Sequence, residues 1–163
     1  MEIGVFARVR AGGAGAPLRV DHNIVAAGTD RGVPFEAVLP EHATTEALHA
    51  RIGHSLLTAF VDGSNAALLL LGESDTGKTH VLAGTGARGG LVPCLISELF
   101  GALEARHAAF ELGCEFSEVY NELITDLVNP GNRASRIVET ADRGTVIDGL
   151  TSRKVGKKKK KEK

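Results

Sequence analysis

Alternating apolar side chains predict strands near both ends of the chain. Ile3, Val5, Ala7 and Val9 alternate with glycine, aromatic and arginine side chains, which is typical of a strand with two different faces. Similar patterns predict further strands at residues 24–27, 33–39, 110–116 and 145–150. The glycine- and alanine-rich residues 11–17 are predicted to form a loop.

Three helices are predicted from helical spacing and from capping residues. Thr44 or Thr45 caps the first helix, and Asp62-Gly63 ends it. Its apolar face recurs at every fourth position, at Leu48, Ile52, Leu56 and Phe60. A second helix begins near Pro93, a residue suited to a first turn. A third, short helix is predicted for residues 121–128, with Asn121 as its cap.

Residues 66–71, Ala-Ala-Leu-Leu-Leu-Leu, are apolar on both faces. Such a run is typical of a strand that is covered by helices on each side. A glycine-containing loop follows it, and then a helix that ends at the glycine-rich residues 84–90. The order strand, loop and helix predicts an α/β fold.

The amino-acid composition indicates what broad class of protein this is. With 163 residues, 43% hydrophobic and 24% charged, the chain is predicted to be globular. Its apolar runs are far too short to span a bilayer, and the N-terminus lacks the pattern of a signal peptide. Cys94 and Cys114 are isolated, as reduced thiols of a cytoplasmic protein would be. We therefore expect a cytoplasmic protein with no membrane or nucleic-acid partner.

Charge is distributed unevenly. The net charge is −1, but residues 156–163 contain six lysines and one glutamate. Two interpretations of this segment are open. It is a disordered end of the chain without homology, or an electrostatic hook for an acidic surface.

The chemistry of the chain is concentrated around one lysine. Up to residue 153, Lys78 is the only lysine, and the other basic residues are arginines. It belongs to an octapeptide that fits the phosphate-binding pattern G-x-x-x-x-G-K-[ST], composed of Gly72, Glu73, Ser74, Asp75, Thr76, Gly77, Lys78 and Thr79. Backbone N–H groups of such a loop bind phosphate oxygens, the lysine neutralises the β- and γ-phosphates, and the threonine hydroxyl binds Mg²⁺. ATP and Mg²⁺ are therefore the predicted ligands.

Two acidic residues of this loop work against strong binding. Glu73 and Asp75 place carboxylates where a polyanion is expected. A carboxylate ~5 Å from a phosphate charge costs about 3 kcal/mol at an effective dielectric of 20, and little if it points into solvent. We hypothesise that Asp75 lowers the affinity for ATP.

The chain resembles the first half of a kinesin motor domain in seven segments that keep the family order. The most specific, Phe116–Glu122 with Asp126-Leu127, resembles F-x-E-I-Y-N-E-x-x-x-D-L-L. The others are Phe6–Arg10 (R-x-R-P, with Ala11 in place of proline), Val33–Leu39 (F-D-x-V-F), Phe60–Ala66 (G-Y-N-A/G-T), Lys78–His80 (G-K-T-H), Gly90–Phe100 (G-I-I-P-R-x-x-x-D-L-F) and Val146–Thr151 (V-x-V-x-G-L-T).

The resemblance implies a P-loop NTPase fold with an incomplete kinesin motor-type central β-sheet flanked by helices. It places a partial motor domain at residues 1–155 and a Lys-rich disordered tail at 156–163. It implies that residues 72–79 contact phosphate and Mg²⁺, that Thr79 is the Mg²⁺ ligand, and that Arg8, Arg10 and His80 flank the adenine. A solvated strand edge for the arginines and an ordinary first-turn position for His80 are the alternatives. Microtubules and tubulin are the implied partners, at the cytoskeleton.

Two family motifs that position the attacking water, switch I (N-x-x-S-S-R) and switch II (D-x-A-G-x-E), do not occur in the sequence. We expect nucleotide binding without turnover or stepping by this polypeptide alone. In the kinesin sheet, the strand at residues 66–71 lies between strands that this sequence does not supply. We therefore expect unpaired strand edges and a marginal, aggregation-prone or partner-completed fold.

Three functions are compatible with these features. The first is a kinesin-like ATPase fragment, and whether it acts as an enzyme is open. The second is a non-catalytic nucleotide-binding scaffold or regulatory module that a partner chain completes. The third is another P-loop enzyme, such as a small-molecule kinase, for which the sequence offers neither a basic lid nor an acceptor pocket.

Overall fold

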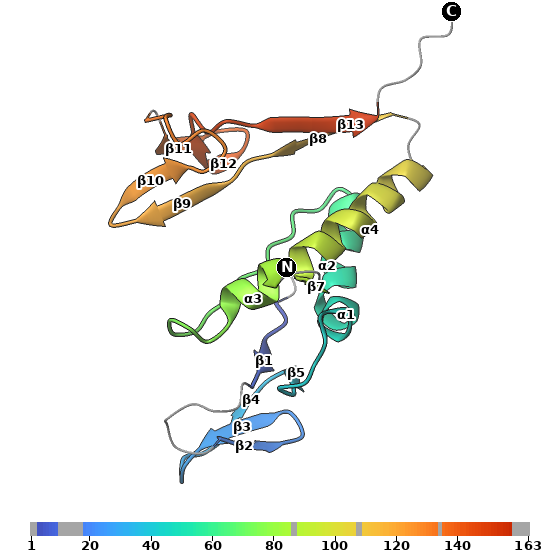
Figure 1. The fold of residues 1–163 in the computed structure, drawn as a ribbon, viewed down its shortest axis with the longest axis vertical. Helices are drawn as coiled ribbons and strands as arrows, with labels where there is room; N and C mark the ends of the chain where they lie inside the picture. The colour runs from blue at the N-terminus through green and yellow to red at the C-terminus, as the bar shows by residue number, and fades with distance from the viewer. Residues whose placement is uncertain (1–2, 10–17, 86–87, 107–108, 134, 158–163) are drawn as a thin grey trace, which may run out of the picture. The chain divides into compact units, whose positions relative to one another are not determined.

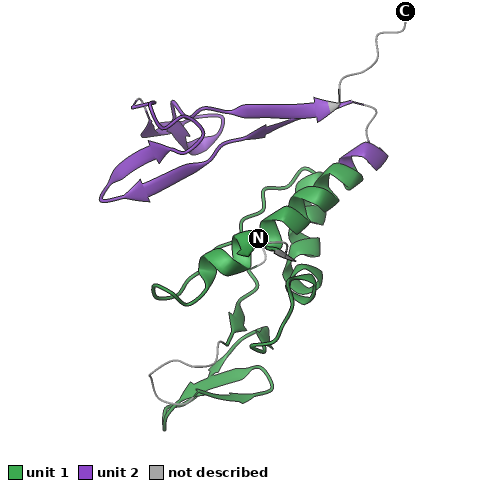
Figure 2. Ribbon diagram, in the orientation of Figure 1, with its two compact units in different colours: residues 1–102 green, residues 103–163 purple. Residues whose placement is uncertain are grey.

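The computed structural model describes residues 3–9, 18–85, 88–106, 109–133 and 135–157. The described chain divides into two compact units, residues 1–102 and 103–163 (Figure 2). Strands and helices are mixed in the first unit, and the second is built mainly of β-hairpins (Figure 1). The mixed α/β class predicted from the sequence is confirmed.

The first unit begins with short strands. Its elements are β1 (Phe6–Arg8), β2 (Leu18–Asp21), β3 (Ile24–Ala27), β4 (Val33–Pro34), β5 (Ala37–Leu39), α1 (Thr45–Leu48), η1 (His49–Gly53), α2 (His54–Val61), α3 (Lys78–Ala83), β6 (Gly84–Thr85), β7 (Arg88–Gly89) and most of α4 (Leu91–Arg106). Strands β1 and β5 pair in parallel, whereas β2, β3 and β4 form an antiparallel meander. The strand predicted at 24–27 is confirmed with the same bounds, and that at 3–9 is confirmed with shorter bounds as β1. The single strand predicted at 33–39 is instead two short strands, β4 and β5.

The first predicted helix exists, but it contains a turn of π-helix. Thr44 is its N-cap and accepts a hydrogen bond from the N–H of Ala47 at 3.2 Å. The π-helical turn η1 separates α1 from α2, and α2 ends at Val61 with Asp62 as its C-cap. A Cβ on Gly53, the last residue of η1, would lie 3.1 Å from the Leu95 side chain of α4. Glycine at this position therefore allows α4 to approach closely.

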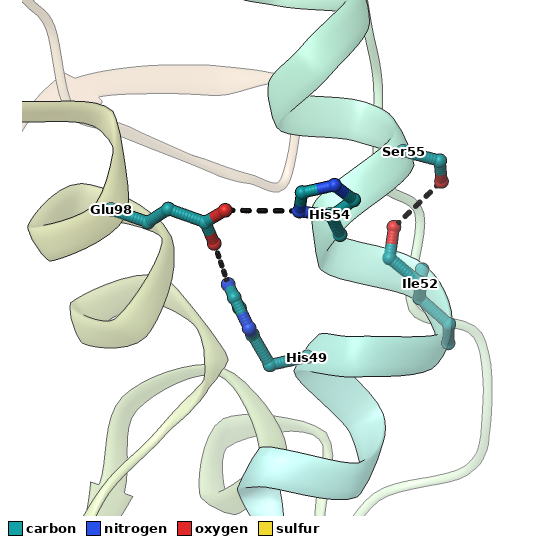
Figure 3. A network of polar contacts seen from close by, with 5 residues as sticks. All are labelled: His49, Ile52, His54, Ser55 and Glu98. Carbon is teal, nitrogen blue, oxygen red and sulfur yellow. Dashed lines mark hydrogen bonds and ion pairs between the residues drawn. The ribbon is translucent and has the colours of Figure 1, made fainter. Parts of the chain in front are cut away.

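Helices α2 and α4 also meet through polar side chains (Figure 3). The Glu98 carboxylate of α4 lies 2.8 Å from Nε2 of His49 and 3.0 Å from Nδ1 of His54. The imidazole of His49 is mostly buried beside Glu98, whereas that of His54 is exposed. The π-turn places these two histidines, five positions apart, toward the same carboxylate.

In its described part, the second unit holds the end of α4 and three antiparallel strand pairs. Its strands are β8 (Phe110–Cys114), β9 (Ser117–Tyr120), β10 (Leu123–Asp126), β11 (Arg136–Thr140), β12 (Gly144–Asp148) and β13 (Arg153–Lys157). Strand β8 pairs with β13, β9 with β10, and β11 with β12. The strands predicted at 110–116 and 145–150 are confirmed. β13 was not predicted, and it includes Gly156 and Lys157, the first two residues of the segment expected to be a disordered tail; residues 158–163 lie outside the described part.

The predicted helix at residues 121–128 is wrong. Asn121 and Glu122 both have positive φ, 46° and 63°, and connect β9 to β10 as a two-residue hairpin turn. A left-handed conformation at both central positions is typical of a type I′ turn, and asparagine tolerates it well. Turn chemistry at Asn121 therefore decides against the helix cap that the same residue suggested.

The predicted buried strand at residues 66–71 is also wrong, because these residues form no strand. Within the described chain, they make no backbone–backbone hydrogen bond. Leu69 and Leu71 are 81% and 90% exposed. The small sheets of the described residues do not join into a central sheet.

The apolar core of the described residues is small. Four hydrophobic side chains are buried, all in the first unit: Leu39, Leu48, Leu57 and Leu91. In the described part of the second unit, Asp126 is the only side chain that is equally well buried, and it is polar. None of the described helices has the length and hydropathy needed to cross a membrane.

Candidate functional site

The loop at residues 72–79 is a compact turn that ends at the start of α3. Gly77 precedes the helix with φ 94°, a left-handed conformation that glycine adopts without strain. The N–H of Val81 donates to the Gly77 carbonyl at 2.9 Å, which closes the first helical turn. A glycine is therefore required where the phosphate-loop pattern places its second glycine.

Lys78 closes this loop over its own backbone. Its Nζ donates hydrogen bonds to the carbonyl oxygens of Gly72 at 2.7 Å and Glu73 at 2.5 Å. The Thr76 hydroxyl donates to the same Glu73 carbonyl at 2.8 Å. The ammonium group is thus held at the centre of the turn by backbone oxygens. An anion that entered the loop would meet this charge directly.

The remaining loop side chains are on the surface. Glu73, Ser74, Asp75 and Thr79 are exposed, and Asp75 has φ 62°. Exposure puts the two carboxylates in the solvated position, in which they repel a bound phosphate least. Thr79 is the second residue of α3. Its hydroxyl is therefore accessible to an ion beside the loop.

Arg8 and His80, predicted to flank the adenine, line one cavity of about 540 Å³. The cavity is in the first unit, and its other walls include Glu41, Thr44 and Glu46. The Nε of Arg8 is buried and has no hydrogen-bond partner among the described residues. A buried N–H without an acceptor is costly, so it favours a ligand that supplies one. Arg10 lies outside the described residues.

The fit to a nucleoside triphosphate rests on these two features together. The lysine-centred loop suits phosphates, and the cavity has a free N–H and a histidine for a base. His80 follows Lys78 and Thr79 directly in α3, so the loop and the cavity are adjacent along the chain. Within the described residues, no three His, Cys, Asp or Glu side chains gather to hold a metal by themselves. A Mg²⁺ here would therefore depend on the Thr79 hydroxyl and on phosphate oxygens.

Asp126 is a second polar centre, and sequence analysis gave it no role of its own. Its side chain is fully buried, and four donors surround it. Oδ1 accepts from the N–H groups of Val128 and Asn129, and Oδ2 accepts from Nδ2 of Asn132 and the N–H of Thr151. The only sequence feature that could have pointed to a buried carboxylate was the position of Asp126 inside the largely apolar residues 123–128.

These donors control the ionisation of Asp126. Burial raises the pKa of its carboxyl, but hydrogen bonds from Asn132, Thr151 and Asn129 outweigh burial and hold the pKa well below its ordinary range. The ionised carboxylate joins the end of β10 to the loop after it and to the segment before β13. Asp126 is therefore a structural group of the second unit.

Comparison with known proteins identifies the family. Residues 17–163 match the family model described as "Kinesin motor domain". The matched range includes residues 156–163, where the end of family similarity was expected, and it begins after Arg8 and Arg10. Those two arginines are thus assigned to the site by resemblance of a short motif alone.

Three relatives illustrate the similarity. "Kinesin-like protein KIF18B" of Mus musculus is 35% identical over 76% of this chain, and "Kinesin-like protein 5" of Schizosaccharomyces pombe is 34% identical over 82%. "Kinesin-like protein KIN-7I" of Oryza sativa subsp. japonica is 30% identical over 83%. The aligned parts make up 15%, 16% and 11% of the respective relatives. The chain thus spans a small part of their length.

Proposed function

Because the chain belongs to the kinesin motor-domain family, we propose that it binds Mg²⁺-ATP and forms the nucleotide-binding portion of a microtubule motor. The observation that carries this proposal is the position of Lys78, whose Nζ is fixed at the centre of the loop by the carbonyls of Gly72 and Glu73. An ammonium held in this way is available to a polyphosphate without a search over side-chain rotamers.

Each part of the site has a separate task in this proposal. The backbone of residues 72–77 and Lys78 hold the phosphates, and the Thr79 hydroxyl binds Mg²⁺. Arg8 offers its buried Nε to the base, and His80 stacks beside it. Arg10, outside the described residues, is assigned to the base by family resemblance alone. When bound, ATP supplies the phosphoryl group whose hydrolysis drives movement in kinesins. Microtubules are the proposed partner, and the cytoskeleton is the proposed location.

A second candidate is a nucleotide-binding scaffold that a partner completes without hydrolysis. It is favoured by the unpaired residues 66–71, which lead directly into the phosphate loop. In this case binding of ATP is retained and turnover is absent.

The test measures binding and hydrolysis separately. Titration of a fluorescent ATP analogue with Mg²⁺ is expected to saturate with wild-type chain and with Lys154→Ala, and to weaken strongly with Lys78→Ala. Lys154 is a suitable control because it is exposed and paired with Glu111, 2.8 Å away. Equal binding by all three proteins would refute the nucleotide site. Hydrolysis stimulated by microtubules would support the motor, and binding without hydrolysis would support the scaffold.

A further inference from the structure

The side chain of Thr76 is directed at the same backbone carbonyl as that of Lys78. The Thr76 hydroxyl donates to the Glu73 carbonyl at 2.8 Å, and the Thr76 N–H donates to the same oxygen at 3.5 Å. The Nζ of Lys78 is a third donor to this oxygen, at 2.5 Å. A Cβ on Gly72 would lie 2.7 Å from the Thr76 hydroxyl oxygen. Glycine at residue 72 therefore leaves the room that this hydroxyl needs.

The Glu73 carbonyl has more donors than it can satisfy well. A carbonyl oxygen carries two lone pairs, and three donors share this one. The Gly72 carbonyl, in contrast, receives a single donor from the described residues, Lys78 at 2.7 Å. If Lys78 left the Glu73 oxygen, that oxygen would keep both donors of Thr76, whereas the Gly72 oxygen would keep none of these contacts. Release of Lys78 from Glu73 therefore costs less free energy than release from Gly72.

Binding of two phosphates requires such a release. An ammonium group has three N–H donors, and Lys78 directs two of them at the carbonyls of Gly72 and Glu73. While both contacts last, Lys78 can donate to at most one phosphate oxygen. The phosphate-loop pattern assigns its lysine to the β- and γ-phosphates together. Lys78 must therefore give up one carbonyl when it contacts both.

We infer that Thr76 is a positioning residue of the nucleotide site, whose hydroxyl holds the Glu73 carbonyl when Lys78 turns from that carbonyl to phosphate. This role rests on the proposed function and deepens it, because it assigns the Thr76 hydroxyl to the loop backbone and not to the ligand. The hydroxyl weakens the hold of the Glu73 oxygen on the ammonium, since both donors compete for the same lone pairs. It also leaves that oxygen hydrogen-bonded after the ammonium has moved. Both effects favour contact between Lys78 and phosphate.

The test compares substitutions of Thr76 in the full chain by titration with a fluorescent ATP analogue and Mg²⁺. Thr76→Val keeps the size of the side chain and removes the hydroxyl. We expect it to raise the dissociation constant about fivefold, the effect of one neutral hydrogen bond. Thr76→Ser keeps the hydroxyl and is expected to bind within about twofold of wild type. Thr145→Val is the matched control, because it makes the same change at an exposed position of β12, outside the loop, and should leave binding unchanged.

A double-mutant cycle separates this role from general support of the loop. In a Lys78→Ala background there is no ammonium to release, so Thr76→Val is expected to change ATP binding by less than about twofold. An equal loss in both backgrounds, or a failure of Thr76→Ser to restore binding, would overturn the inference. Equal binding by wild type and Thr76→Val would also overturn it and would leave the proposed nucleotide site intact. Failure of the wild-type chain to bind ATP would instead refute the proposed function, and the role of Thr76 with it.

Discussion

The Nζ of Lys78 lies 2.7 Å from the carbonyl oxygen of Gly72, so the lysine ties the end of the phosphate loop to its beginning. This contact makes Lys78 a support of the loop, in addition to the phosphate-binding role that we propose for it. The two roles can be separated by experiment, because the support of the loop is present without nucleotide.

Lys78→Ala is expected to reduce affinity for Mg²⁺-ATP by about tenfold to a hundredfold, the effect of one charge-assisted hydrogen bond of about 1.5–3 kcal/mol. Without nucleotide, the same variant is expected to be cleaved faster within residues 72–77, because the carbonyls of Gly72 and Glu73 lose their donor. Calorimetry and limited proteolysis measure the two effects. Unchanged cleavage would show that Lys78 does not hold the loop.

The charge of Asp75 is expected to oppose phosphate binding. Because Asp75 is exposed, its repulsion is screened, and we expect Asp75→Asn to tighten ATP binding by about fivefold, or about 1 kcal/mol. Asparagine tolerates the left-handed φ of 62° at this position, so the change isolates the charge. Asp75→Gly should tighten binding similarly and also relieve the backbone. If neither substitution changes the nucleotide dissociation constant, the hypothesis about Asp75 is wrong.

The sequence was informative at several positions where local chemistry decided the structure. A helix cap at Thr44 or Thr45, and a glycine loop that leads into a helix at Lys78, were predicted from neighbouring residues, and the structure selects Thr44 as the cap. Residues 66–71 were mispredicted as a strand because a strand requires partners, and partners are not a local property. The predicted helix at 121–128 failed for another reason, since Asn121 suits both a helix cap and a left-handed turn.

In the candidate site, too, features set by neighbouring residues could be predicted, and features set by distant residues could not. The phosphate loop could be recognised because its function depends on consecutive residues. The joint position of Arg8 and His80 on one cavity was expected only through family resemblance, since they are far apart in sequence. Asp126 could not be assigned a role beforehand, because its donor from Thr151 belongs to a distant segment.

Asp126 is expected to make the second unit sensitive to acid. Its pKa is lower in the folded chain, so its contribution to stability is fully present above the unfolded value, about 3.9, and is lost as pH falls below it. Asp126→Asn is expected to destabilise the unit at neutral pH, because an amide NH₂ must then face two donors. The substitution should also remove most of the loss of stability of this unit at low pH. Circular dichroism as a function of pH measures both, and an unchanged acid midpoint in the variant would contradict this role.

The hairpin turn at Asn121 and Glu122 is expected to become more stable when glycine replaces Glu122. Glu122 has φ 63°, which costs a residue with a side chain about 1 kcal/mol relative to glycine. Glu122→Gly should therefore stabilise the β9–β10 hairpin by about that amount, because Asn-Gly is the preferred type I′ pair. Glu118→Gly, within β9, is the control and should be destabilising. Thermal unfolding distinguishes the two, and a loss of stability in Glu122→Gly would argue against the turn.

Glu98 is expected to hold α4 against the π-turn and α2. Its two carboxylate oxygens contact different histidines, His49 at 2.8 Å and His54 at 3.0 Å (Figure 3). Glu98→Ala removes both contacts and should lower the free energy of unfolding by about 1–2 kcal/mol, because the mostly buried imidazole of His49 loses the carboxylate beside it and His54 loses its hydrogen-bond partner. Glu104→Ala, on an exposed position of the same helix, should change it by less than about 0.5 kcal/mol. Denaturant titration of both variants measures the difference. Equal effects would mean that the carboxylate at Glu98 is no more than another helix surface charge, and that apolar packing alone joins the helices.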